Sequence, residues 1–297
     1  MALLILLMAI STNDSLPQID KHWDFSNPAL SEERFAELAQ KGLESEDELY
    51  YLECLTQMAR AQGLQQNFDS AHATLDMVQK NLPDDTTLVN VRYMLERGRV
   101  YNSSKARADA IRYFKDALIL AQAIEADYYA VDAAHMLGIA EEPDAALEWN
   151  VTAIKMAEAS SDERTKKWLG ALYNNTGWTY HDREDYLHAQ ALFEKSLQWN
   201  LENGSERTIN IAKWTIGRGL RSLQQYPKAL ETQMGLLDSG YHSGYVYEEI
   251  GELLLLTGDE EASRSYFKTA FEKLSEDAWL VKYEGERLER LEKLGGE

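Results

Sequence analysis

The sequence predicts an all-α protein in which pairs of antiparallel helices repeat along the chain. Three observations support this prediction. Small residues recur at a near-constant interval, apolar residues recur at fixed distances from them with helical spacing, and short polar breaks separate the two halves of each unit. We therefore expect helices throughout and no strands.

The repeating unit is clearest between Gly170 and Gly204. On one face of its first helix, residues are spaced four and then three apart: Tyr173, Gly177 and Tyr180. After a polar break over residues 181–185, the second helix repeats that spacing: Ala189, Phe193 and Ser196. Gly177 and Ala189 are small enough for the two backbones to approach closely, and Phe193 fills the space beside that contact.

The same register runs along most of the chain. The small residue of the first helix recurs at Ala59, Gly98, Gly138, Gly177, Gly217 and Gly251, in steps of 39, 40, 39, 40 and 34. The small residue of the second helix recurs at Ala71, Ala110, Ala146, Ala189, Ala229 and Ser263. Four positions further on, the packing residue is Leu75, Phe114, Asn150, Phe193, Gln233 and Phe267.

This pattern resembles the tetratricopeptide repeat (TPR), a helix–turn–helix unit of about 34 residues. The resemblance covers roughly residues 50–275. It implies a TPR-type α-solenoid, a right-handed superhelix of antiparallel helix pairs with a C-terminal capping helix. Because most steps exceed the usual repeat length by five or six residues, we expect helices longer by about one turn, or longer loops.

Two units depart from the pattern. In the third, the offset between the two small residues is 8 instead of 12, and we expect Pro143 to open its second helix, where the missing N–H costs nothing. Asn150 in the third unit and Gln233 in the fifth replace the usual aromatic residue. These two units are expected to pack less tightly than the others.

The chain divides into four predicted parts: an apolar segment over 1–15, an N-terminal extension with a capping helix over 16–47, six repeats over 48–274, and a capping helix over 275–297. The apolar run Met1–Ile10 is too short to span a bilayer, which needs about 20 residues. It fits the core of a secretory signal ending near Ser11, although no basic residue precedes it. The alternatives are a helix that packs onto the first repeat, or a misassigned start. The single cysteine, Cys54, suits a reducing compartment, so a cytoplasmic location is favoured over export.

Both capping segments carry aromatic residues. Trp23 and Phe25 are expected to cover the exposed end of the solenoid, and Ser31 is expected to cap the helix that follows. Near the C-terminus, residues 275–294 predict one amphipathic helix whose apolar side consists of Trp279, Leu280, Tyr283, Leu288, Leu291 and Leu294. A polar outer side on this helix suits a terminal cap.

Composition and motifs argue against several function classes. With 30 basic and 50 acidic residues the net charge is −20, which disfavours binding to nucleic acid or to an anionic membrane. No phosphate-binding glycine loop or zinc-protease motif is present. His181 and His188 have Asp182 and Asp185 nearby, but four matched ligands are not visible, so we expect no metal and no cofactor. Cys54 is expected to be a buried thiol.

In TPR arrays the first helices line a concave surface, so the register predicts which side chains face it. The candidate peptide-binding residues are Arg92, Arg99, Asn102, His135, Asn174, Trp178, His181, Trp214, Arg218 and Arg221. Arginine and tryptophan contribute strongly to binding energy at interfaces, and the arginine fork matches a carboxylate. The lysines of the carboxylate clamp known from chaperone-binding TPR domains are absent, so that ligand is not carried over.

We therefore expect a non-enzymatic adaptor that binds an extended, acidic peptide or a C-terminal carboxylate of a partner protein. The competing interpretation of the same residues is structural: Trp178 and Trp214 pack between neighbouring repeats, and the arginines pair with local acids. A second function class is a regulatory sensor of a small signal or signal peptide, because long-period TPR arrays of bacterial regulators resemble this one. No basic recognition helix for DNA accompanies it. An enzyme with an unrecognised site is the remaining class.

Overall fold

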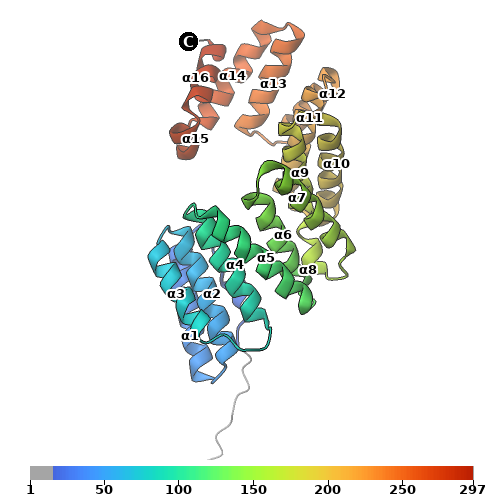
Figure 1. The fold of residues 1–297 in the computed structure, drawn as a ribbon. Helices are drawn as coiled ribbons and strands as arrows, with labels where there is room; N and C mark the ends of the chain where they lie inside the picture. Colours follow the sequence, from blue (N-terminus) through green and yellow to red (C-terminus); the bar gives the residue numbers. More distant parts are fainter. Residues whose placement is uncertain (1–15, 297) are drawn as a thin grey trace, which may run out of the picture. The chain divides into compact units, whose positions relative to one another are not determined.

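The computed structural model describes residues 16–296, and every regular element among them is a helix (Figure 1). The predicted signal segment, Met1–Ser11, lies outside the described residues. By its contacts the chain divides into two compact units, Met1–Glu142 and Pro143–Glu297. The boundary falls between the two helices of the third predicted repeat, and each unit is described by itself.

Residues 16–142, the described part of the first unit, contain a short 3₁₀ helix and six α-helices. In chain order they are η1 (Ile19–His22), α1 (Pro28–Glu44), α2 (Glu48–Leu64), α3 (Phe68–Lys80), α4 (Leu88–Ser103), α5 (Arg107–Ala123) and α6 (Asp127–Ala140). Each helix packs on the next, and α2 also packs on α4, which in turn contacts α6. The first helices of successive predicted repeats, α2, α4 and α6, therefore lie side by side.

The second unit is built in the same way from paired helices. Its helices are α7 (Pro143–Ala159), α8 (Glu163–Lys166), α9 (Leu169–Asp182), α10 (Tyr186–Asn203), α11 (Glu206–Ser222), α12 (Tyr226–Asp238), α13 (Gly244–Thr257), α14 (Glu260–Leu274), α15 (Ala278–Tyr283) and α16 (Gly285–Gly295). The pairs α9–α10, α11–α12 and α13–α14 pack closely, and α11 contacts both α9 and α13. As predicted, Pro143 opens α7.

In the second, fourth, fifth and sixth helix pairs the seam is built from the recurring glycines. A Cβ atom added at Gly98 would lie 2.5 Å from the Phe114 ring, and one added at Gly251 would lie 2.9 Å from the Phe267 ring. Both phenylalanines are fully buried. In the fifth pair Gln233 takes the aromatic position, is fully buried, and donates from Nε2 to the Trp214 carbonyl at 3.0 Å. In these pairs the residues that the sequence pattern placed opposite one another are therefore the residues that pack together.

The extra residues lie partly in the helices, since the turns inside the pairs are short, and partly in the connections between pairs, since residues 81–87 separate α3 from α4. In the first pair only residues 65–67 separate α2 from α3. Several of these turns place a residue other than glycine in the left-handed region, including Gln66 (φ 64°) and Lys105 (φ 67°). Such a conformation costs energy for a side chain with a Cβ, so the packed helices on both sides maintain it.

The structure corrects the predicted start of the N-terminal helix. Helix α1 begins at Pro28, and the Asn27 side chain caps it by accepting from the Leu30 N–H at 3.2 Å. Ser31 lies inside the first turn, where its buried hydroxyl donates to the Asp24 carbonyl at 2.9 Å. Proline favours the first helical position and asparagine favours the cap, which explains the shift of one turn.

The C-terminal cap also differs from the prediction. It consists of two helices, because the backbone leaves helical geometry at Glu284 (φ −125°, ψ 36°). The break changes the phase of the apolar stripe. Leu280, Leu288 and Leu291 are buried, whereas Trp279 is mostly exposed. Tyr283 is exposed like Trp279, so these two rings do not join the apolar side.

Two further features concern the end of α13 and the hydropathy of the helices. Gly258 ends α13 in the left-handed conformation (φ 89°), as expected for a helix C-cap. No helix within residues 16–296 is long and apolar enough to cross a membrane.

Candidate functional site

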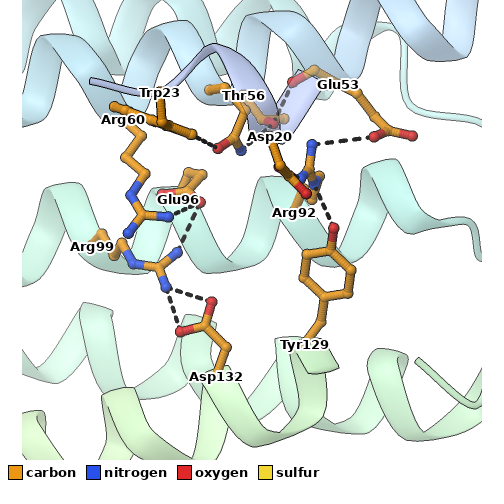
Figure 2. Close-up of polar contacts among 11 residues, drawn as sticks. Asp20, Trp23, Glu53, Thr56, Arg60, Arg92, Glu96, Arg99, Tyr129 and Asp132 are labelled. Atoms are coloured by element: carbon orange, nitrogen blue, oxygen red, sulfur yellow. Dashed lines mark hydrogen bonds and ion pairs between the residues drawn. The ribbon is translucent and has the colours of Figure 1, made fainter. Parts of the chain in front are cut away.

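The candidate site is the face formed by the first helices of the repeats, α2, α4 and α6 in the first unit and α9, α11 and α13 in the second. We call it the first-helix face of each unit. On α4, the buried Arg92 guanidinium pairs with the carboxylates of Asp20 and Glu53, the latter at 3.2 Å, and donates to the Tyr129 hydroxyl at 3.1 Å (Figure 2). Arg92 thus joins the N-terminal segment, α2 and α6.

A second cluster lies one helical turn or two further along the same helices. Arg99 donates to both Asp132 carboxylate oxygens, at 2.5 and 2.6 Å, and to Glu96 at 2.8 Å (Figure 2). Arg60 on α2 lies 3.8 Å from the same Glu96 carboxylate. Glu96 and Asp132 are both buried. Two buried carboxylates and two arginines therefore balance one another across the first helices of three successive repeats, α2, α4 and α6.

The segment from residue 16 to 27, which we call the strap, lies on the first-helix face of the first unit. Asp20 pairs with Arg92, and the Trp23 indole N–H donates to Gln57 on α2 at 3.1 Å. The Arg60 guanidinium sits 5.3 Å from the centre of the Trp23 ring, within cation–π range (Figure 2). Trp23 also packs against Phe35 of α1. The strap therefore contacts the side of the helices as well as the end of the array.

On the second unit, two predicted arginines share one acid. Arg218 and Arg221 of α11 lie 3.0 and 2.7 Å from the Glu249 carboxylate of α13. Glu249 is buried, whereas about a quarter of the Arg218 side chain remains exposed. Further along, Arg287 of α16 binds Glu248 at 2.5 Å. The pairing with local acids, considered as an alternative from the sequence, is therefore present for all four predicted arginines.

A row of aromatic rings runs beside this cluster. The Trp178 ring of α9 lies 6.0 Å from the Trp214 ring of α11, which lies 5.8 Å from the Tyr245 ring of α13. The Trp214 indole N–H donates to the Tyr245 carbonyl at 3.1 Å. The His181 ring is 5.0 Å from Trp178. The two tryptophans thus pack between neighbouring repeats, and both stay partly exposed.

The remaining predicted residues are partly exposed on the same helices. Asn102 lies in the last turn of α4, and His135 lies on α6. Asn174 accepts from the Thr215 hydroxyl at 3.4 Å, and His181 Nε2 lies 2.8 Å from the Ser222 hydroxyl. The sequence register therefore places the set on the first-helix faces, divided between the two units.

Several members of the clusters are not among the predicted residues, including Arg60, Glu53, Glu96 and Asp20. Arg60 directly follows Ala59, the same register position that Arg99 and Arg218 occupy, so the rule used for the later repeats predicts it. Glu96 lies on α4 with the predicted Arg92 and Arg99, and Glu53 lies on α2 with Arg60, but helical spacing alone does not identify their partners. Asp20 carries no register signal, since the strap precedes the repeats.

Burial and neighbouring charge shift several pKa values in these clusters. Burial raises the pKa of Glu53, opposed by Arg92. Burial also lowers the pKa of His135, and that of His181, where Arg218 adds to the effect. Cys54 is buried as expected, and burial raises its pKa to about 12, so its thiol stays protonated at neutral pH.

Comparison with known proteins gives matches through structure alone. No family model and no curated protein matches the sequence. The apo form of RapI superposes with a TM-score of 0.70 at 15% identity, covering 88% of this chain and 76% of that one. A STAND protein with a tetratricopeptide repeat sensor, PH0952 from Pyrococcus horikoshii, gives a TM-score of 0.71 at 15% identity, covering 90% of this chain and 43% of that one.

A tetratricopeptide repeat protein from Parabacteroides merdae also matches, with a TM-score of 0.51 at 15% identity over 94% of this chain and 97% of that one. At these identities the similarity establishes the fold. It agrees with the recurring small residues, the stacked helix pairs and the packing of first helices on one another. The chain is a TPR-type α-solenoid.

Proposed function

We propose that this protein is a non-enzymatic interaction module whose first-helix faces bind an extended acidic segment of a partner protein. The observation that carries the proposal is the strap. A segment of the chain itself lies across α2 and α4, with one carboxylate on Arg92 and one indole beside Arg60. An acidic, aromatic peptide segment therefore fits the chemistry of this face.

The geometry of the strap supports an extended ligand. The backbone is extended at Gln18 and at Trp23, on both sides of the short helix η1. The Tyr50 hydroxyl donates to the Pro17 carbonyl at 2.8 Å, so the face also recognises main-chain atoms. Side-chain pockets and main-chain hydrogen bonds are the usual combination in peptide recognition.

The second unit offers comparable groups without a covering strap among its described residues. Arg218 and the edges of Trp178 and Trp214 are partly exposed. Arg218 pairs with Glu249, but that acid also holds Arg221 through two hydrogen bonds, at 2.7 and 2.9 Å. A ligand carboxylate can therefore recruit Arg218 while Glu249 keeps a cation.

A second candidate is a regulatory sensor of a small signal or signal peptide. It is favoured by the similarity to PH0952, which is described as carrying a tetratricopeptide repeat sensor, and by a cavity of about 380 Å³ in the second unit. A thermal shift with small molecules in the absence of protein partners would favour this candidate over the adaptor.

The test is a pull-down that compares two charge-matched variants. Arg60→Gln with Arg218→Gln alters both first-helix faces, and Glu96 and Glu249 keep Arg99 and Arg221. The control alters two arginines of the second helices that are 60% exposed, Arg112→Gln and Arg264→Gln. The proposal expects loss of the wild-type partner only in the first variant. Equal capture by both variants would contradict it.

A further inference from the structure

A cavity of about 380 Å³ opens in the second unit between the beginnings of α11 and α13. Its lining residues are Arg207, Ile211, Trp214, Tyr241, Ser243 and Tyr245. Four of these six side chains are aromatic or aliphatic, and the volume falls within the usual range for ligand pockets of about 300–1,000 Å³. Of the six, only Trp214 belongs to the set predicted from the sequence.

The polar groups of this cavity favour an anion. Arg207 is exposed on the first turn of α11 and pairs with no carboxylate in the part of the chain that the structure describes. Two of the acids close to Tyr245 already have a cation, since Arg287 binds Glu248 at 2.5 Å and Glu284 at 2.7 Å. The cavity therefore combines an apolar wall with an arginine that is available to a ligand.

The start of α13 adds to this preference. Ser243 is the N-cap of α13, and its side chain makes no capping hydrogen bond, so the hydroxyl is available within the cavity lining. The first N–H groups of a helix also favour a negative charge. These groups add to the preference for a negative charge that Arg207 creates, and the site depends on the cavity and Arg207.

We propose that this cavity binds an aromatic side chain of an extended acidic peptide, while Arg207 pairs with a carboxylate about three residues away from that side chain. The proposal rests on the proposed function and names the ligand chemistry of its second unit. Arg207 and Trp214 are seven residues apart, which places them about 10 Å apart along the helix axis. Three residues of an extended peptide cover about the same distance. A carboxylate on the aromatic residue itself would lie too close to the ring to reach Arg207.

The experiment uses the full chain labelled with 5-fluorotryptophan, in which the Trp214 fluorine signal is assigned from its loss in Trp214→Phe. The probe is the peptide acetyl-Glu-Gly-Gly-Phe-Gly-Gly-Glu-amide, which places a carboxylate three residues from the ring in either direction. We expect the peptide to shift the Trp214 signal in a saturable manner. Replacing both glutamates by glutamine, or phenylalanine by alanine, should weaken binding at least tenfold.

Protein variants separate the pocket from general charge effects. Arg207→Gln should weaken binding of the acidic peptide about tenfold and leave binding of the glutamine peptide unchanged. The control Arg264→Gln, an exposed arginine of α14 in the same unit, should leave both unchanged. Equal binding by the acidic and glutamine peptides, or no effect of Arg207→Gln, would overturn the proposal. So would equally tight binding of free phenylacetate, which would make the cavity a small-molecule site.

The outcome for the cavity can be distinguished from that for the proposed function. If the peptide fails to shift Trp214 while the Arg60 and Arg218 variant still loses its partner, the cavity proposal is wrong and the first-helix faces remain the binding surface. If both experiments fail, the proposed function is wrong as well.

Discussion

Asp20 and Arg92, 72 positions apart in the sequence, form an ion pair that fastens the strap to the first-helix face of the first unit. Arg92 is buried and would keep Glu53 and Tyr129 as partners if Asp20 were replaced by asparagine, whereas the Asp20 side chain is 40% exposed. The arginine is therefore the centre of the cluster and the aspartate is its replaceable partner.

This asymmetry predicts two different stabilities. Asp20→Asn should cost about 1 kcal/mol, because a partly exposed partner is lost while Arg92 keeps its others. Arg92→Met should cost about 3–5 kcal/mol, because the half-buried Glu53 then loses its cation. Urea unfolding of the two variants against wild type measures both values. Equal costs would contradict the assignment of Arg92 as the centre.

The seam between paired helices predicts opposite signs for two glycine substitutions in the second unit. Gly251→Ala should destabilise by about 1–3 kcal/mol, because the new Cβ would lie 2.9 Å from the Phe267 ring. Gly235→Ala should stabilise by about 0.5–1 kcal/mol, because Gly235 is exposed in α12 and a Cβ there meets nothing within 4 Å. Thermal and urea unfolding measure both. Destabilisation by both substitutions would show that the seam is not specific.

The two arginines on Glu249 predict a non-additive effect. Arg218→Gln alone should cost about 1 kcal/mol or less, because Arg221 still neutralises the buried acid. Changing both arginines to glutamine should cost about 3–5 kcal/mol, because Glu249 then remains buried without a cation. Adding Glu249→Gln should recover part of that loss. Failure of this rescue in a double-mutant cycle would contradict the shared pairing.

His181 predicts a pH dependence of stability. Burial and Arg218, with Arg221, lower its pKa, while Asp182 and Glu249 act in the opposite direction. The unfolded chain then binds a proton near the ordinary pKa of about 6.5 that the folded protein excludes. The contribution of neutral His181 to the free energy of unfolding is therefore complete above about pH 6.5 and is lost as the pH falls further.

The measurement is the unfolding free energy of wild type and His181→Gln between pH 7.5 and pH 5.5. The variant should lose stability less steeply on acidification, although His72 and His135, whose pKa values are also lowered, keep some of the slope. An unchanged or steeper slope in the variant would mean that His181 is protonated in the folded protein.

Much of the fold could be predicted because the repeat constrains it locally. The spacing of glycines and alanines fixed which helix faces meet, and Pro143 marked a helix start, so Gly98 and Phe114 meet as expected. The turns were not predictable to the same degree. Gln66 adopts positive φ because the helices on both sides impose it, and glutamine gives no local signal for that conformation.

The sequence predicted which residues of the candidate site lie on the first-helix faces, but not the ion pairs that these residues form. The register places Arg99 and Arg218 on the first-helix faces, because helical spacing determines a face. It does not identify Asp132 as the partner of Arg99. The two residues are 33 positions apart in the sequence, and their contact depends on how α4 packs on α6. The strap was assigned to the end of the array because an irregular segment carries no periodicity.

The proposed function depends most directly on which surface of the protein a partner contacts. A photo-crosslinking residue, p-benzoylphenylalanine, can be placed on the first-helix faces at Asn102 or Asn174, and on the second helices at the exposed Ile119 or Leu187. We predict that the residue crosslinks to one partner protein from the first two positions and not from the last two. Crosslinking of that partner from Ile119 or Leu187 alone would contradict this prediction.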